Sequence, residues 1–247
     1  MTLMTLRAYA PWMVRELVPR ALVPMVLFGV FAGLPVYAMV HSQRSDPSYN
    51  LEALGNILTM AYVGTIPLCC TLGAFLFMTR SIAEDRERQY VRFLFSHAVA
   101  PAQFYLTRYV VGLLTFLLFF LPLPLIARYY GADVPLAASM LAMTVTLVFV
   151  GGLTTLCAAL VNKEGLALVF VYAGSQLIQR FHTQDMLADW LDPVAQVLPP
   201  VGPLGTAVDT LLRGGAWPTN ELILVVGYGL GMLVAGLLVL RRAPLVR

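Results

Sequence analysis

The sequence predicts an all-α membrane protein with six transmembrane helices, and three observations lead to that prediction. Hydrophobic residues make up 59% of the 247-residue chain and charged residues only 12%, whereas a soluble domain carries about 25% charged residues. Six apolar stretches approach the length of about 20 residues that a helix needs to cross a bilayer. The basic residues are concentrated on one side of these stretches, as the positive-inside rule requires.

The predicted spans form a single transmembrane domain over residues 1–247. They are expected at residues 21–40, 57–79, 104–127, 136–161, 166–181 and 221–240. By this assignment, each Asp, Glu, Lys and Arg lies at or beyond the end of a span. Pro67, Pro122 and Pro124 predict kinks, because proline removes a backbone donor and crowds the preceding turn.

The orientation follows from the charges. With the N-terminus inside, twelve of the sixteen Lys and Arg residues lie on the cytoplasmic side, and eight of the thirteen Asp and Glu residues lie outside. Six spans return the C-terminus to the cytoplasm, where Arg241, Arg242 and Arg247 agree with this orientation. The net charge of +3 is therefore a topology signal, and we expect the lipid bilayer as a partner and no nucleic acid. Fifteen of the sixteen basic residues are Arg, a bias typical of GC-rich bacterial genomes. The expected location is the bacterial inner membrane, with both termini cytoplasmic.

Residues 1–20 favour a helix that lies along the inner leaflet. Apolar residues such as Trp12, Met13 and Leu17 are interspersed with Arg15 and Glu16. Such a mixture suits an interfacial helix with the tryptophan at headgroup depth. A floppy polar tail is the alternative, but the stretch is too apolar for it.

Residues 81–97, between the second and third spans, hold the most informative pattern. A charged cluster precedes an apolar patch, and the residues concerned are Glu84, Asp85, Arg86, Glu87, Arg88, Arg92, Phe93 and Leu94. On a helix, Glu84 and Arg88 form an i,i+4 pair in the favourable order. A solvated loop would explain the arginines, but neither the acidic residues nor the apolar patch. A helix that packs on the membrane domain and offers a polar face to a protein partner explains both.

Residues 183–213, on the outer side between the fifth and sixth spans, are too apolar for an ordinary loop. They predict two short amphipathic helices that are broken at Pro199-Pro200, because proline cannot continue a helix. Non-helical backbone at membrane depth is tolerated only where protein covers it or where it lines a cavity.

Small residues occur at helix-packing spacing in two of the spans. Gly29 pairs with Gly33, and Gly227 pairs with Gly231. Such pairs let two helix backbones approach closely. We interpret them as packing contacts within the chain, with a dimer interface as the alternative.

Two amides are the most polar groups of the fifth span. Gln176 and Gln179 lie three residues apart and therefore on one helix face. Amides inside a membrane usually hydrogen-bond a neighbouring helix. Lining a substrate path is the alternative role for both.

The stretch from Ile82 to Tyr109 resembles the signature region of ABC type-2 transporter permeases. In that family a segment close to I-x-x-E-R-E-x-G-T-L-E-x-L-L-S-x-P-V-S follows the second span and leads into the third. The matching residues here are Asp85-Arg86-Glu87, Phe93-Leu94, Ser96, Val99 and the basic Arg108. The chain departs from the pattern at Gln89-Tyr90, at Arg92 in place of the second Glu, and at Ala98 in place of Pro.

The resemblance extends over essentially the whole chain and implies a fold and a function. It implies an N-terminal elbow helix at 1–20, a cytoplasmic coupling helix at 81–97 that docks on an ATPase, and a re-entrant helical hairpin at 183–213. The implied function is the permease subunit of an ABC exporter. The implied partners are a separate ABC ATPase subunit and a second permease, either another copy of this chain or a homologue, which together form the substrate pathway.

The chain itself is not expected to be an enzyme or to hold a cofactor. It contains no GxxxxGK[ST] phosphate-binding loop, so ATP and Mg²⁺ would bind to the partner ATPase. His41, His97 and His182 are scattered and suggest no catalytic or metal site. The alternatives are an ion-driven or facilitative carrier, which intramembrane charge would favour, and a membrane enzyme or scaffold. The sequence does not specify the substrate.

Overall fold

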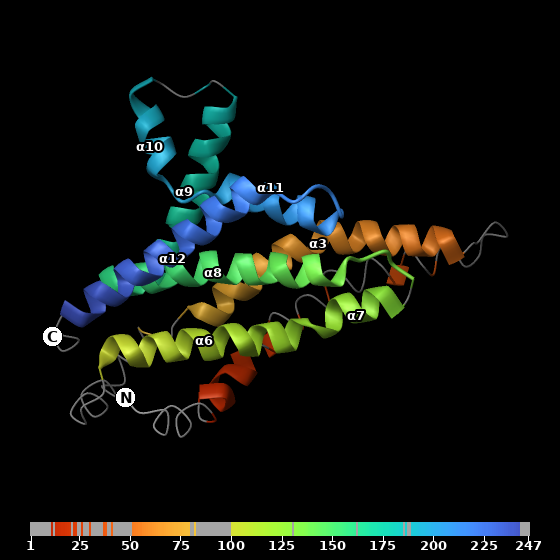
Figure 1. The fold of residues 1–247 in the computed structure, drawn as a ribbon, viewed down its shortest axis with the longest axis horizontal. Coiled ribbons are helices and arrows are strands. Elements are labelled where there is room, and N and C mark those ends of the chain that lie inside the picture. The colour runs from red at the N-terminus through yellow and green to blue at the C-terminus, as the bar shows by residue number, and fades with distance from the viewer. Residues whose placement is uncertain are drawn as a thin grey trace.

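The computed structural model is helical throughout the part of the chain that it describes (Figure 1). The described residues are 11, 13–20, 22, 23, 26, 30, 37, 38, 41, 51–79, 82, 100–129, 131–161, 163–184, 186 and 189–242. Four helices among them are long and apolar enough to cross a membrane: Gly55–Leu76, Pro101–Tyr129, Leu136–Leu160 and Thr219–Arg241. They coincide with the predicted second, third, fourth and sixth spans. The all-α class is therefore confirmed, with four helices fit to span a membrane, whereas the count of six spans stays a prediction.

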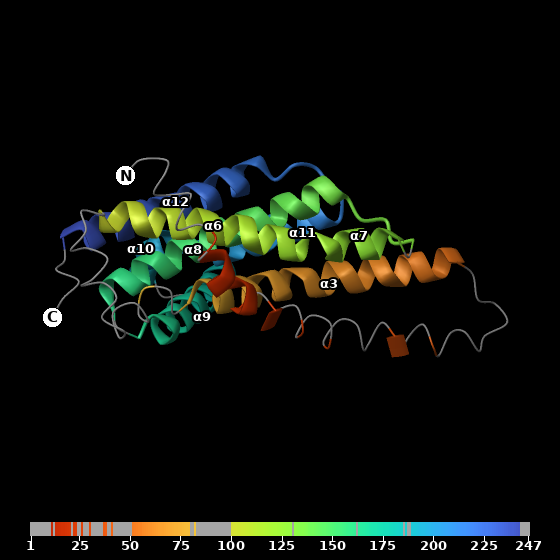
Figure 2. The ribbon, with the colours of Figure 1, turned by 90° about the horizontal axis from the view of Figure 1, so that it is seen from below.

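The helices follow one another in a simple order. They are α3 (Leu51–Met78), α6 (Pro101–Phe120), α7 (Pro122–Tyr129), α8 (Leu136–Leu160), α9 (Glu164–Thr183), the short 3₁₀ helix η2 (Asp189–Leu191), α10 (Asp192–Val197), α11 (Val201–Leu212) and α12 (Thr219–Arg242). Seen from below, α3 and the α6–α7 pair run side by side along the long axis of the molecule (Figure 2). The predicted first span at 21–40 lies almost wholly outside the described residues.

Helix α8 is the centre of the fold. About 61% of its membrane-spanning window is buried, against 28% for the windows of α6–α7 and α12. It packs against α3, α6, α11 and α12. Its threonines do not need partners on other helices, because their hydroxyls donate to carbonyl oxygens one turn earlier, as Thr146 does to Ala142 at 2.8 Å. An almost uniformly apolar helix can thus be surrounded by protein.

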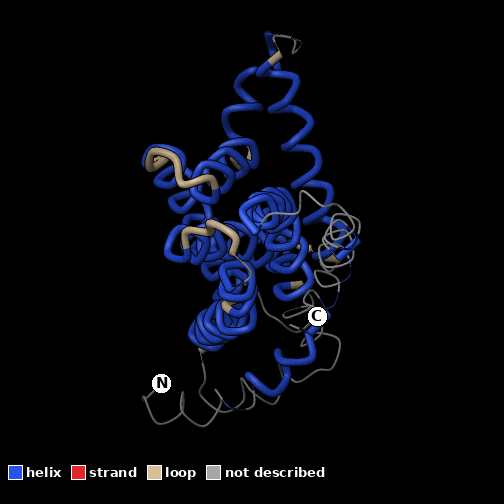
Figure 3. The backbone as a smooth tube through the Cα atoms, turned by 90° about the vertical axis from the view of Figure 1, so that its right-hand side faces the viewer, coloured by secondary structure: helices blue, strands red, loops and turns tan. Residues whose placement is uncertain are grey.

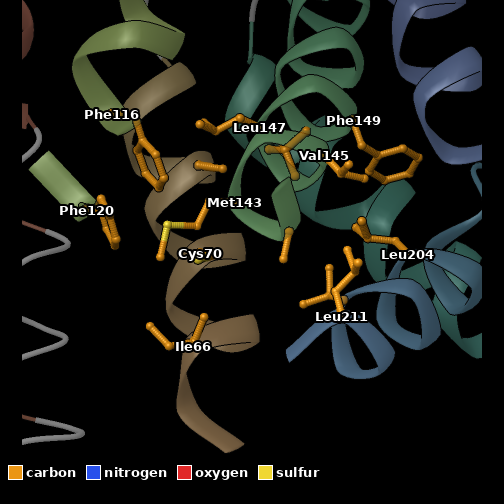
Figure 4. Close-up of a cluster of buried hydrophobic side chains, with 14 of the residues drawn as sticks. Ile66, Cys70, Phe116, Phe120, Met143, Val145, Leu147, Phe149, Leu204 and Leu211 are labelled. Atoms are coloured by element: carbon orange, nitrogen blue, oxygen red, sulfur yellow. The ribbon is translucent and has the colours of Figure 1, made fainter. Parts of the chain in front are cut away.

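The core lies between α8 and its neighbours. Figure 4 shows side chains of α3, α6, α8 and α11 converging there. Phe116 and Phe120 of α6 are fully buried, with their rings stacked 4.0 Å apart. On the other side of α8, Leu204 and Leu211 of α11 belong to the same cluster. Unfolding any one of these helices would therefore expose apolar side chains that are buried in the core.

Glycines bring α8 and α12 together along their length. A Cβ atom on Gly152 of α8 would overlap the carbonyl oxygen of Gly229. A Cβ on Gly229 would lie 2.8 Å from the Val148 carbonyl oxygen, and one on Gly236 would lie 2.9 Å from the Leu156 nitrogen. The contact is therefore backbone against backbone, as small residues permit in membrane helices.

The prediction that Gly227 and Gly231 of α12 form a helix-packing contact is wrong for the described part of the chain. Gly227 and Gly231 are exposed, and a Cβ on either would meet nothing within 4 Å. They lie two residues from Gly229, which is about 200° around the helix and so on the opposite face. The other predicted pair, Gly29 and Gly33, lies outside the described residues.

Proline interrupts the third span as predicted. Helix α6 ends at Phe120, Leu121 separates the two helices, and α7 begins with Pro122 (Figure 1). The N–H of Leu121 still donates to the Leu117 carbonyl oxygen at 2.9 Å, and beyond it neither Pro122 nor Pro124 has an N–H to continue the helical hydrogen bonds. Helix α3, by contrast, continues through Pro67 without a break.

The turn between α7 and α8 is fixed against α3. Gly131 has a φ of +90°, which favours glycine. A Cβ on Gly55 of α3 would lie 2.5 Å from the Gly131 carbonyl oxygen, and the N–H of Asp133 donates to Thr59 Oγ1 at 2.9 Å. These contacts define the start of α8 at the end of the molecule that we predict to be outer.

Helices α9 and α10 project away from the layer formed by α8 and α12 (Figures 1 and 3). Helix α9 has 20 residues but is not among the four helices that are apolar enough to span a membrane. It carries Gln176, Gln179, Arg180 and His182 toward its C-terminal end. The fifth span predicted at 166–181 is thus a helix, and its crossing of the bilayer stays a prediction.

The predicted helix break in residues 183–213 is confirmed. Helix α10 ends at Val197, residues 198–200 are not helical, and α11 begins at Val201. No acidic or hydroxyl side chain caps α11, whose preceding residue is Pro200. The Val201 N–H donates to the Pro199 carbonyl oxygen at 2.8 Å and Pro203 has no N–H, so Gly202 is the residue of this first turn that needs a partner from another part of the chain.

Candidate functional site

Two cavities flank α9, and together they form the candidate functional site. The first, of about 750 Å³, is a groove between α3, α9 and α11 with Thr146 of α8 at its base. Its lining is mainly apolar, and the polar groups that it includes are Thr71, Thr79, Thr146, Tyr172 and Gln176. A long apolar groove with few polar groups is the usual form of a site for a hydrophobic or amphiphilic molecule.

The second cavity, which we call the outer cavity, lies between α9, α10, α11 and α12. Its volume is about 840 Å³, within the range of about 300–1,000 Å³ that is typical of small-molecule sites. Unlike the groove, it is lined by charged side chains, among them Arg180 of α9 and Glu221 of α12. The two cavities thus differ in the chemistry that they present.

One face of α9 connects the two cavities. Ala173 and Gln176 line both of them. Gln176 is exposed, and within the described part of the chain it makes no hydrogen bond. Of the two roles that the sequence allowed for this amide, its position favours the lining of a path over the bonding of a neighbouring helix.

Gln179, one turn further along α9, has the other role. Its Nε2 donates to the Pro199 carbonyl oxygen at 2.8 Å, and its Oε1 accepts a hydrogen bond from the Gly202 N–H at 2.9 Å. One side chain therefore serves both ends of the break between α10 and α11. It supplies a partner to one of the N–H groups that α11 leaves unsatisfied at its start.

A second side-chain hydrogen bond connects α12 to α10 and α11, the two helices that we call the hairpin. The hydroxyl of Tyr228 donates to the carbonyl oxygen of Val197, the last residue of α10. Tyr228 and Gln179 both line the outer cavity. Side-chain hydrogen bonds from Gln179 of α9 and Tyr228 of α12 thus connect these two helices, which form walls of the cavity, to the hairpin.

A buried ion pair lies between α6 and the N-terminal segment, outside both cavities. Arg108 of α6 is only 4% exposed, and its Nη2 lies 2.7 Å from Oε1 of Glu16. Arg20 approaches the same oxygen at 3.1 Å. This corrects the expectation that all charges lie at the ends of spans, because Arg108 lies inside α6 and within the candidate span Pro101–Tyr129. The burial is tolerated because a carboxylate is supplied by the N-terminal segment.

The N-terminal helix and the start of the predicted coupling segment meet in one apolar cluster. Residues 13–20 are helical, as predicted, and Met13 is buried. Met13 packs in one cluster with Ile82, with Phe104 at the start of α6, and with Leu240 near the end of α12. Ile82, at 2% exposed, is the only described residue of the 81–97 segment. Through Ile82, the cluster therefore attaches the start of that segment to the helices.

All eight predicted coupling residues lie outside the described residues: Glu84, Asp85, Arg86, Glu87, Arg88, Arg92, Phe93 and Leu94. Their role stays a prediction from the sequence. Within the described part of the chain, no group of three or more His, Cys, Asp or Glu side chains could hold a metal ion.

The sequence interpretation missed the charged pair of the outer cavity. Arg180 lies in the last turn of α9 and Glu221 in the first turn of α12. These two turns precede and follow the hairpin, so the two residues belong to the same end of the molecule. A comparison of the charges at the ends of the fifth and sixth spans could have identified them.

Comparison of the chain with protein-family models, with curated proteins and with solved structures finds no match.

Proposed function

We propose that this chain is the permease subunit of an ABC exporter of the bacterial inner membrane. The observation that carries the proposal is the segment at 81–97, where acidic and basic residues precede an apolar patch between the second and third spans. A cytosolic loop that only obeys the positive-inside rule needs neither the acids nor the apolar residues. A helix that docks on an ATPase uses both.

The attachment of this segment supports a mechanical role. Ile82 packs with Met13, Phe104 and Leu240 in a single cluster. A displacement of residues 81–97 would therefore act at once on the N-terminal helix, on α6 and on α12. Packed clusters of this kind transmit small shifts because protein interiors have low compressibility.

The groove between α3, α9 and α11 supports a transport path. It is open on one side, and its apolar lining with few polar groups suits a molecule that enters from the membrane. We propose that a second copy of the chain, or a homologue, faces this groove and completes the pathway. Gln176, which lines both cavities, would then lie where the groove meets the outer cavity.

The ion pair of Arg108 and Glu16 favours a second candidate, an ion-driven carrier. Ionisable groups buried among membrane helices are the usual mark of proton relays. Both hydrogen bonds of the Glu16 carboxylate are made by Oε1, whereas Oε2 is buried without a hydrogen-bond partner in the described structure. Protonation of Glu16 would remove one of the interactions that hold Arg108. A carrier that uses this exchange would need no ATPase.

One experiment separates the two candidates. The tagged chain is purified from its native membranes, and the complex is reconstituted in liposomes. For an exporter we expect a co-purified protein that contains the GxxxxGK[ST] loop, and ATP turnover that requires both proteins. Transport by the chain alone, driven by a pH gradient and abolished by Glu16→Gln, would establish the carrier instead.

A further inference from the structure

We infer that the outer cavity binds a zwitterionic headgroup, with the attached acyl chain lying along α9 and α12. The inference concerns equilibrium binding to this chain, and it does not depend on the proposed function. Its basis is the pair of opposite charges that face one cavity, Arg180 and Glu221. A ligand that carries an anionic and a cationic group would satisfy both.

The two charges are available to a ligand. The described part of the chain contains ion pairs between Glu16 and Arg20, Glu16 and Arg108, and Asp209 and Arg213. Arg180 and Glu221 take part in none of these and have no other ionic partner among the described residues. Arg180 is exposed and Glu221 is partly buried. A guanidinium binds phosphate or carboxylate with two parallel hydrogen bonds, and a carboxylate accepts hydrogen bonds from an ammonium group.

The remaining lining fits an amphiphile. Gln176, Gln196 and Thr206 provide amide and hydroxyl groups that can hydrogen-bond an ester or a hydroxyl. Leu177 and Leu224 line the same cavity and are 55% and 51% exposed. These leucines offer an apolar surface to an acyl chain, whose burial there favours binding.

The cavity is also held in shape without a ligand. The bonds from Gln179 to Pro199 and Gly202, and from Tyr228 to Val197, fix α9, α12 and the hairpin relative to one another. A site whose walls are already ordered loses less entropy on binding. This distinguishes the outer cavity from a gap between loosely attached helices.

Helix dipoles provide a purely structural explanation for each charge alone. A basic residue in the last turn of α9 and an acidic residue in the first turn of α12 both suit the local dipole. That explanation predicts an effect of each residue on helix stability and no preference for any ligand. Binding selectivity therefore decides between the two explanations.

The test measures binding to the purified full chain in a nonionic detergent. Native mass spectrometry follows titrations with short-chain phosphatidylethanolamine, which is zwitterionic, and with phosphatidylglycerol of the same chain length, which is anionic. We expect the zwitterionic lipid to bind more tightly, and Arg180→Gln or Glu221→Gln to weaken it about tenfold or more. Glu221→Gln should abolish the preference, because the phosphatidylglycerol headgroup has no ammonium.

Two controls accompany these variants. Arg180→Lys keeps the charge and should retain most of the binding. Arg213→Gln removes an exposed arginine that does not line the cavity, and it should leave both lipids unaffected. Equal affinity of the wild-type chain for the two lipids would overturn the inference. Unchanged affinities in Arg180→Gln and Glu221→Gln would overturn it as well.

Competition with glycerophosphoethanolamine identifies the source of the headgroup. This water-soluble zwitterion carries the same phosphodiester and ammonium charges and lacks acyl chains. If it displaces the lipid at similar concentrations, the inferred charge recognition is supported and a soluble zwitterion is sufficient. If the lipid binds selectively and is not displaced, the acyl chain is required and the source is the bilayer.

Discussion

Arg108 and Glu16 form an ion pair of 2.7 Å between residues that are 92 positions apart in the sequence. The pair fastens the N-terminal helix to α6 at the end of the molecule where Ile82 is also buried. The pair fixes the relative position of the two helices and adds little net stability, because the desolvation of the two charges offsets much of their attraction. Replacing only one of the two charged residues nevertheless lowers the stability of the protein.

We predict that Glu16→Gln destabilises the protein by about 1–3 kcal/mol. Breaking a fully buried ion pair costs about 3–5 kcal/mol, and the 26% exposure of Glu16 reduces this value. Thermal unfolding in detergent measures the change. The double variant Glu16→Gln/Arg108→Met should recover part of the loss, since it removes the buried guanidinium together with the carboxylate that pairs with it.

The control for this prediction is Asp209→Asn. It removes the pair between Asp209 and Arg213, whose side chains are 48% and 66% exposed. Exposed pairs in water contribute little to stability, so the unfolding temperature should not change. Equal effects of the two substitutions would show that the burial of Arg108 is energetically unimportant.

A second prediction concerns the contact between α8 and α12. Gly152→Ala should lower stability by about 1–3 kcal/mol or more, because the new Cβ overlaps the carbonyl oxygen of Gly229. Gly227→Ala should be neutral or slightly stabilising, since nothing described lies within 4 Å and alanine is the better helix former. Unfolding temperatures of the two variants test this. A larger loss of stability in Gly227→Ala than in Gly152→Ala would show that Gly227 is a packing residue.

The same pair of variants bears on the dimer. If Gly227 lies at an interface between two copies, Gly227→Ala lowers the dimer fraction in native mass spectrometry without lowering the stability of the monomer. This result would support the alternative that the sequence left open for the Gly227 and Gly231 pair.

The third prediction concerns the amide that closes the hairpin break. Gln179→Leu should speed hydrogen exchange at Gly202, because its N–H loses the acceptor that lies 2.9 Å away. The two lost hydrogen bonds contribute about 1 kcal/mol each. Gln176→Leu serves as the control, since Gln176 makes no hydrogen bond within the described residues. Unchanged exchange in Gln179→Leu would mean that the break is held by packing alone.

The sequence predicted those features that depend on local pattern. The apolar length of α8, the interruption at Pro122, and the break before Val201 follow from hydropathy and from proline chemistry. These signals lie within one segment, so no knowledge of the remaining chain is needed to interpret them.

Features that depend on helix rotation could not be predicted in the same way. Gly227 and Gly231 have the spacing of a packing motif, but α12 presents Gly229 and Gly236 to α8. Spacing alone does not determine which face of an apolar helix is turned inward. The pairing of Arg108 with Glu16 and the meeting of Arg180 and Glu221 at one cavity likewise require the arrangement of several helices.

The orientation of α8 provides the fourth prediction. Asp133 lies three residues before the start of α8 and Lys163 three residues after its end, and both are exposed. A cysteine at Asp133 should react with an impermeant thiol reagent in whole cells, and a cysteine at Lys163 only after permeabilisation. The basis is the excess of basic residues on the inner side. Alanine replaces Cys69, Cys70 and Cys157 in the background, and the opposite labelling pattern would invert the topology.

The central claim is that residues 81–97 couple the membrane helices to an ATPase. Asp85→Lys/Glu87→Lys tests it, because the double substitution reverses the charge offered to a partner and should place no charge in lipid. Like charges that meet across an interface cost several kcal/mol. In a solvated loop, the loss of exposed ion pairs would cost only about 0–1 kcal/mol. Arg44→Glu, on the predicted outer side, is the matched control.

The deciding measurement is the amount of ATPase that co-purifies with the chain, together with its ATP turnover in liposomes. Wild type, Asp85→Lys/Glu87→Lys and Arg44→Glu are compared at equal membrane expression. We predict that the double variant loses the ATPase and its turnover, while Arg44→Glu keeps both. Undiminished co-purification and turnover in the double variant would contradict the coupling role and leave residues 81–97 as a solvated loop.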